Sequence, residues 1–286
     1  DKAQQAQMQA LNYANYDGDP TGEIRTKLLD DAYGMLRYAR KLSPHNGDVL
    51  FLLGKVADDS GRATAAIEAL EAYVKESATP QPEAHQRLGR LYLRMHQTDP
   101  AIRHLRQGLV GAGQTAVTTV YLATALTAAG RGDDATQLLA DALDDQHGQY
   151  WNVEATILGL ALAVAYDREE QLSSAFQTID HMQSALTSSY APQLQQSIAS
   201  IQFVPAIDQR YWQALFYESN GFYAEARAEW LNYAAGGADA KWKDRALAHV
   251  AAIDKIRAEE LKARKNNKGK KPPEPPPPPP GGYPVP

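Results

Sequence analysis

The 286-residue chain contains no cysteine, so it can form neither a disulfide framework nor a thiolate metal site. An apolar window of about eighteen residues, which a membrane-spanning helix needs, is also missing. No Gly-rich phosphate loop and no Gly-x-Ser-x-Gly motif occurs, so the signals of nucleotide-dependent enzymes and of serine hydrolases are lacking. From these absences we expect a protein that is neither an enzyme nor a cofactor carrier and that does not cross a membrane.

Metal-binding patterns are equally scarce. The seven histidines are scattered, and none forms a His-x-x-x-His pair with a third ligand nearby. One acidic loop places Asp17, Asp19 and Thr21 at positions 1, 3 and 5 of a calcium loop. Leu28 occupies position 12, where the bidentate Glu belongs. The loop is therefore a weak metal candidate, and a helix-joining turn capped by Thr21 is favoured.

Charge is distributed unevenly along the chain. The net charge is −5, but residues 255–286 hold eight basic and three acidic side chains, a net of +5. Residues 1–254 therefore carry −10. An acidic body repels phosphates, so we expect no nucleic-acid partner. The basic end of the chain is the part that would attract an anionic surface or a second partner.

Against these absences stands an internal repeat of 34 to 35 residues. Three segments open with Leu and a small residue, continue with an Ala twelve positions later, and add a Leu four positions further: Leu53-Gly54, Ala66 and Leu70; Leu88-Gly89, Ala101 and Leu105; Leu122-Ala123, Ala135 and Leu139. A repeat of this length with small residues at fixed offsets predicts stacked helical hairpins, in which small residues mark close helix approaches. The sequence thus predicts an all-α solenoid.

The pattern resembles the tetratricopeptide repeat (TPR) family over roughly residues 24–235. A later unit carries Ala214, Tyr217, Gly221 and Ala226, and Tyr150 to Leu186 resembles a degenerate unit. The resemblance implies a right-handed superhelix of antiparallel helix pairs that binds a protein partner in its concave groove. It also places His85 at a position that a large residue between helices occupies, so we expect His85 to be a core residue.

We expect four regions. Residues 1–22 form an N-terminal helix and turn, residues 23–238 a solenoid of five to six units, and residues 239–265 a helix that caps the stack. Residues 266–286 form a basic, proline-rich tail that cannot build a core and should be an extended, disordered polyproline II segment. The insertion Ser188–Pro205 interrupts the period, and we expect an extra helix there that either leaves the groove open or covers it.

Carried over position by position, the resemblance assigns the partner-binding groove. The assigned side chains are Phe51, Lys55, Arg90, Arg94, Val117, Val120, Thr124, Thr156, Leu160, Tyr211 and Leu215. The middle of this set is apolar and its N-terminal part is charged. Such a groove suits an amphipathic helix or an extended apolar peptide.

Two settings fit these features. The chain begins at Asp1 and lacks cysteine, which favours a periplasmic or outer-membrane-associated adaptor in a bacterial envelope machine for pili, secretion or motility. The alternatives are a cytoplasmic scaffold, whose polyproline tail is bound by a partner domain, and an accessory subunit of an enzyme complex.

Overall fold

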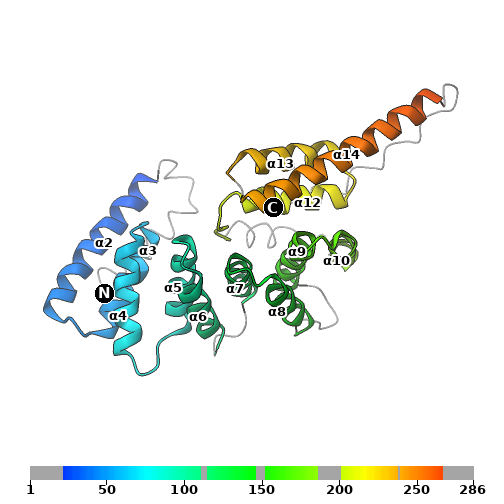
Figure 1. Cartoon of the computed structure of the whole chain (residues 1–286). Coiled ribbons are helices and arrows are strands. Elements are labelled where there is room, and N and C mark those ends of the chain that lie inside the picture. The colour runs from blue at the N-terminus through cyan, green and yellow to red at the C-terminus, as the bar shows by residue number, and fades with distance from the viewer. Residues whose placement is uncertain (1–21, 111–114, 146–151, 186–200, 238, 267–286) are drawn as a thin grey trace. The chain divides into compact units, whose positions relative to one another are not determined.

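The fold is known from a computed structural model that describes residues 22–110, 115–145, 152–185, 201–237 and 239–266. In this part of the chain all regular structure is helical, and the twelve helices follow one another as packed pairs (Figure 1). The all-α prediction is thereby confirmed. The predicted N-terminal helix, the acidic loop at Asp17, Asp19 and Thr21, most of the Ser188–Pro205 insertion and the proline-rich tail lie outside the described residues.

The helices group into two compact units divided between Ala125 and Leu126. Unit 1 contains α2 (Glu23–Leu42), α3 (Gly47–Asp59), α4 (Ala63–Glu76), α5 (Pro82–Arg94), α6 (Thr98–Leu109) and most of α7 (Ala116–Ala128). Unit 2 contains α8 (Gly132–Asp145), α9 (Val153–Arg168), α10 (Leu172–Ala185), α12 (Asp208–Ser219), α13 (Tyr223–Ala235) and α14 (Ala240–Asn266). We call α3, α5, α7, α9 and α12 first helices, and α2, α4, α6, α8, α10 and α13 second helices.

Each pair is closed by the same tight turn. The second residue beyond the end of each first helix adopts a left-handed backbone, with φ between 56° and 75°. These residues are Gly61, His96, Gly130, Glu170 and Gly221. The next backbone N–H then donates to a carbonyl five residues earlier, as Arg62 does to Ala57 at 2.7 Å and Gln171 does to Tyr166 at 2.8 Å. Because Glu170 makes this turn, the degenerate unit is a regular helical hairpin despite its weak sequence match.

Within a pair the helices meet at a glycine. A Cβ added to Gly54 would lie 2.5 Å from Cγ of Leu70, and one added to Gly89 would lie 2.3 Å from Cγ of Leu105. Both glycines precede their leucine by sixteen residues, as the repeat predicted. The small residues Ala66, Ala101 and Ala135 are all buried, as the pattern required.

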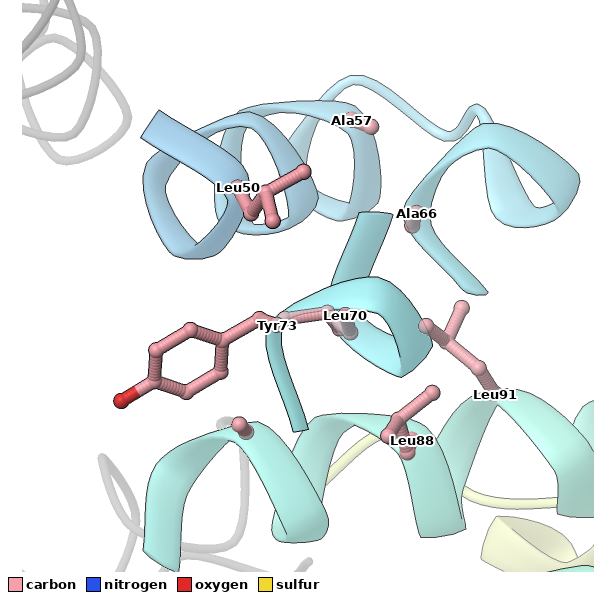
Figure 2. Packing of buried hydrophobic residues seen from close by; sticks show 8 residues of the cluster. Leu50, Ala57, Ala66, Leu70, Tyr73, Leu88 and Leu91 are labelled. Carbon is pink, nitrogen blue, oxygen red and sulfur yellow. The ribbon is translucent and has the colours of Figure 1, made fainter. Parts of the chain in front are cut away.

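Successive pairs share their core. Leu70 and Tyr73 of α4 lie between Leu50 of α3 and Leu88 of α5, so each second helix is covered by two first helices (Figure 2). The cluster has no exposed leucine and continues through Ala57, Ala66, Ala84 and Leu91. This stacking is what fixes the first helices side by side.

The last helix, α14, docks on unit 2 through a buried ionic network. Asp167 at the end of α9 is fully buried and accepts hydrogen bonds from Tyr211 Oη at 2.6 Å and Arg245 Nη2 at 2.5 Å. Nε2 of His249 lies 3.1 Å from both carboxylate oxygens of Asp167, and its Nδ1 lies 2.8 Å from Oε2 of Glu218. The same Glu218 oxygen accepts from Trp230 Nε1 at 2.7 Å. With a carboxylate at each ring nitrogen, His249 donates from both nitrogens and is cationic.

Burial and pairing compete in this network. Burial disfavours the charged imidazolium, but the hydrogen bonds to Asp167 and Glu218 prevail and raise the pKa of His249 to about 9. Burial likewise opposes the Asp167 carboxylate, yet its hydrogen bonds to His249, Arg245 and Tyr211 lower its pKa to about 2. Each charge is retained because the other is present.

The exposed turn at His96 provides a test of the hairpin geometry. A left-handed backbone is strained for a side chain with a Cβ, so His96→Gly should raise the free energy of unfolding by about 0.5–1 kcal/mol. Gly61→Ala, at the equivalent turn, should lower it by about 1 kcal/mol. Urea denaturation followed by circular dichroism measures both. A His96→Gly protein less stable than the parent would contradict the assigned turn.

The network predicts alkaline destabilisation. The pKa of His249 in the folded state is about 9, above the ordinary 6.5. The stability that His249 contributes is therefore fully present below pH 6.5 and is lost as the pH rises through about 9. We expect a loss of about 1–3 kcal/mol over that range. The loss should be absent in His249→Gln and unchanged in the control His96→Gln. Thermal unfolding between pH 6 and pH 9.5, a range that spans both the ordinary pKa of 6.5 and the raised pKa of about 9, makes the comparison; equal slopes in all three proteins would refute it.

Candidate functional site

The first helices of unit 1 carry an internally paired charge cluster. We call it the α3–α5 cluster, and it consists of Lys55, Asp58 and Asp59 on α3 and Glu83, Arg87 and Arg90 on α5. Three cations face three carboxylates, so the cluster is neutral as a whole. It occupies the face on which the family resemblance places the groove.

Arg87 is the centre of the cluster. Its Nη1 lies 2.8 Å from Oδ2 of Asp58 and 2.9 Å from Oδ1 of Asp59, while its Nε lies 3.0 Å from Oε1 of Glu83. Burial opposes the charge, but these carboxylates prevail and raise the pKa of Arg87 above its ordinary value. Arg87 joins two neighbouring repeats, because α3 and α5 belong to successive pairs.

Two of the predicted partner-binding cations take part in this pairing. Lys55 Nζ lies 3.1 Å from Oε1 of Glu83, and Arg90 Nη2 pairs with Asp58, whose side chain is 2% exposed. The sequence did not reveal these pairs, since the partners are 28 and 32 residues apart. The only signal available was that opposite charges occur at neighbouring groove positions in successive units. Lys55 and Arg90 therefore join two successive repeats through their ion pairs.

Other predicted groove residues remain available to a partner. Phe51 is half-buried, with its ring 4.9 Å from that of Tyr73 and with Lys55 Nζ 5.2 Å from its centroid. Arg94, one turn beyond Arg90, is exposed and has no ion pair within the described part of the chain. Val117 and Thr124 on α7 are half-buried. Among the predicted groove residues, unit 1 thus presents the aromatic ring of Phe51 beside Tyr73 and the unpaired guanidinium of Arg94.

The remaining predicted residues lie in the interior: Val120, Thr156, Leu160, Tyr211 and Leu215 are all buried. Thr156 and Leu160 belong to α9, whose residues 155–164 are buried on every side because α8, α10 and α12 all contact this helix. A helix that is apolar all round is a core helix. A partner would reach these five side chains only after the surrounding helices moved.

A second polar cluster lies between α5 and α6. Nδ1 of His85 and Nδ1 of His104 are 2.9 Å apart, and Nε2 of His104 lies 3.1 Å from Oε1 of Glu71, which also accepts from Tyr92 Oη at 2.7 Å. Burial lowers the pKa of His85, and burial likewise lowers that of His104, so the pair is held neutral with one shared N–H. His85 is a core residue, as expected from the sequence. Among the described residues no group of three or more ligand side chains is arranged to hold a metal ion.

Comparisons with known proteins agree with this geometry. Residues 25–85 match the tetratricopeptide repeat family model. No curated protein matches the chain in sequence. None of the helices described combines the length and apolar character that a membrane crossing requires.

Similar folds occur among solved structures. A variant of a kinesin light chain candidate from Podosopora anserina, with nearly identical TPR-like repeats, is 18% identical with a TM-score of 0.52, covering 65% of this chain and 96% of that one. A double mutant of MamA from RS-1 is 15% identical with a TM-score of 0.50, covering 65% of this chain and 94% of that one. At these identities the likeness concerns the fold alone. Together with the family match over residues 25–85 and the recurring hairpins, it shows that the described helices have the tetratricopeptide repeat fold.

Proposed function

We propose that the protein is a non-enzymatic adaptor whose first-helix face in unit 1 binds an apolar peptide or helix of a protein partner. The observation that carries the proposal is that two neighbouring first helices, joined by ion pairs, carry the half-buried ring of Phe51 on α3 and the exposed, unpaired guanidinium of Arg94 on α5. Phe51 is immobilised by Tyr73, and Arg94 keeps an unpaired charge. An ordered aromatic ring offers contact area at little entropic cost, and an unpaired guanidinium can select a partner's carboxylate.

The α3–α5 cluster supports this role by its rigidity. Its carboxylates pair with its guanidinium groups across the two helices, so α3 and α5 are held in register before a partner arrives. Preorganisation of this kind lowers the entropic cost of binding. The cluster itself is then a support for the binding face, and the ligand contacts are made by Phe51, Arg94, Val117 and Thr124.

For the cellular setting, we propose a bacterial envelope complex that builds or operates pili, secretion systems or motility machinery. The complete lack of cysteine suits an oxidising compartment, and the basic tail suits attachment to an anionic surface or to a second partner. The alternatives are a cytoplasmic scaffold whose tail is bound by a partner domain, and an accessory subunit of an enzyme complex. Fractionation of the source cells separates them: recovery of the native protein with the cytoplasm would exclude the envelope setting.

The groove is tested by exposed substitutions. Arg94→Glu should lower the recovery of the partner that co-purifies with the native protein about three- to tenfold, because it places like charges together. Adding Phe51→Ala should lower recovery more than about tenfold. The matched control is Arg103→Glu, an exposed arginine of the second helix α6. Quantitative mass spectrometry of affinity-purified complexes measures recovery, and circular dichroism verifies folding. Undiminished recovery with both changes would place the partner elsewhere.

The tail is tested by shortening the chain. Residues 266–286 have no apolar face, so a protein ending at Lys265 should melt at the same temperature as the full chain. We expect it to be recruited less efficiently into the native complex while keeping its partner at the first-helix face. Fluorescence microscopy of tagged chains in the source cells measures recruitment. Recruitment at the level of the full chain would reduce the tail to a linker.

A further inference from the structure

We propose that unit 1 has a second binding site, on its second-helix side, for an acidic peptide segment that carries one apolar side chain. The site is a pocket of about 560 Å³ that we call the α2–α4 pocket. It is lined by Tyr33, Arg37, Arg40 and Lys41 of α2, Pro44 of the following turn, Leu53 of α3, and Ala65 and Glu68 of α4. This site is additional to the first-helix face, to which it contributes no residue.

The pocket arises from the way the helices stack. Both α2 and α4 pack on α3, and the furrow between them is floored by the buried Leu53. Tyr33, Ala65 and Pro44 make its walls apolar. A volume of this size accommodates a short peptide with one buried side chain. The apolar requirement on the ligand follows from this floor.

The rim of the pocket is cationic and unpaired. Arg37, Arg40 and Lys41 make no ion pair within the residues that the structure describes, and the guanidinium carbon of Arg37 lies 5.8 Å from the centroid of the Tyr33 ring. Glu68 supplies one carboxylate, so the lining carries a net charge of +2. Spacings of three and four residues place the three cations on one side of α2. Two or more carboxylates are needed to neutralise that rim.

A comparison within the chain shows that helix stacking does not require this charge. An equivalent furrow in unit 2, of about 320 Å³, lies among α8, α9 and α10. Its lining is Leu143, Leu162, Tyr166, Ser174, Gln177, Thr178 and His181, without a single Lys or Arg. The two furrows thus arise from the same helix arrangement, and the lining is cationic in unit 1 but has no Lys or Arg in unit 2.

The favourable interaction of cations with the carbonyl end of a helix explains only two of the three cations on the rim of the pocket. Arg40 and Lys41 lie in the last turn of α2, where cations are favourable beside the carbonyl end of a helix. Arg37 lies outside that turn and projects to the same pocket. The carbonyl end of α2 also disfavours a compact multiply charged anion such as phosphate. Separate carboxylates, each matched to a planar guanidinium, fit the arrangement better.

The probes are end-blocked peptides in which one Leu, Phe or Tyr is flanked on each side by two Glu residues. We expect at least one of the three peptides to bind the full chain with a dissociation constant below about 1 mM, measured by fluorescence anisotropy.

Arg37→Glu combined with Arg40→Glu should weaken that binding at least about tenfold. The matched control is Arg103→Glu combined with Arg106→Glu, which changes the net charge by the same amount at two exposed positions of α6. This control should leave the dissociation constant within about twofold of the parent value. Ala65→Trp fills the pocket without changing charge and should also weaken binding about tenfold.

Further measurements test whether the pocket recognises the carboxylates of the peptide. Peptides with Gln in place of Glu should bind at least about tenfold more weakly, and raising salt should weaken the Glu peptides. No binding by any Glu peptide, equal binding by the Gln peptides, or binding retained by folded Arg37→Glu/Arg40→Glu protein would each overturn the proposal. Tighter binding to inorganic phosphate or to vesicles of anionic lipid than to peptide would overturn it too. Arg94→Glu with Phe51→Ala should leave peptide binding unchanged, so this site can fail or succeed independently of the first-helix face.

Discussion

The close approach of two helices within each pair is the constraint on which the rest of the structure depends. Gly54 and Gly89 have no space for a Cβ because Leu70 and Leu105 lie against them. The hairpin turn after each first helix then fixes the direction in which the chain returns. Once these two features repeat, each second helix is covered by two first helices, and the core grows by addition of similar units. Neither feature requires a catalytic or metal-binding residue.

The same stacking produces two surfaces with different chemistry. First helices of successive pairs lie close enough for Arg87 to contact Asp58 and Asp59 of the preceding pair. Second helices are farther apart, because each is separated from the next by a first helix, and this leaves the furrow above Leu53. One surface is therefore internally neutralised, while the other has the α2–α4 pocket and carries unpaired cations. A scaffold can use both at once because neither needs the other's side chains.

The sequence predicted those features that repeat at short range. Leu53-Gly54 and Leu88-Gly89 identified the hairpins, and small residues at Ala66 and Ala101 identified the close contacts. Groove positions were less predictable, because a position assigned by register says nothing about how many helices surround it. Thr156 and Leu160 are buried since α9 contacts three other helices. The Asp167–His249 pair joins residues 82 apart and has no local signal in the sequence. About half of the predicted groove residues consequently remain accessible.

The pairing state of a charged side chain decides what it can do for recognition. Recruiting Arg90 to a ligand would require separating it from Asp58, which would leave a buried carboxylate without its partner. Such a loss costs about 1–3 kcal/mol or more, and this offsets much of the gain from a new ion pair. Arg94, Arg37 and Arg40 involve no such loss, because they are unpaired in the described structure. Recognition by charge should therefore depend on unpaired cations such as these three arginines, whereas the buried pairs determine which helices lie side by side.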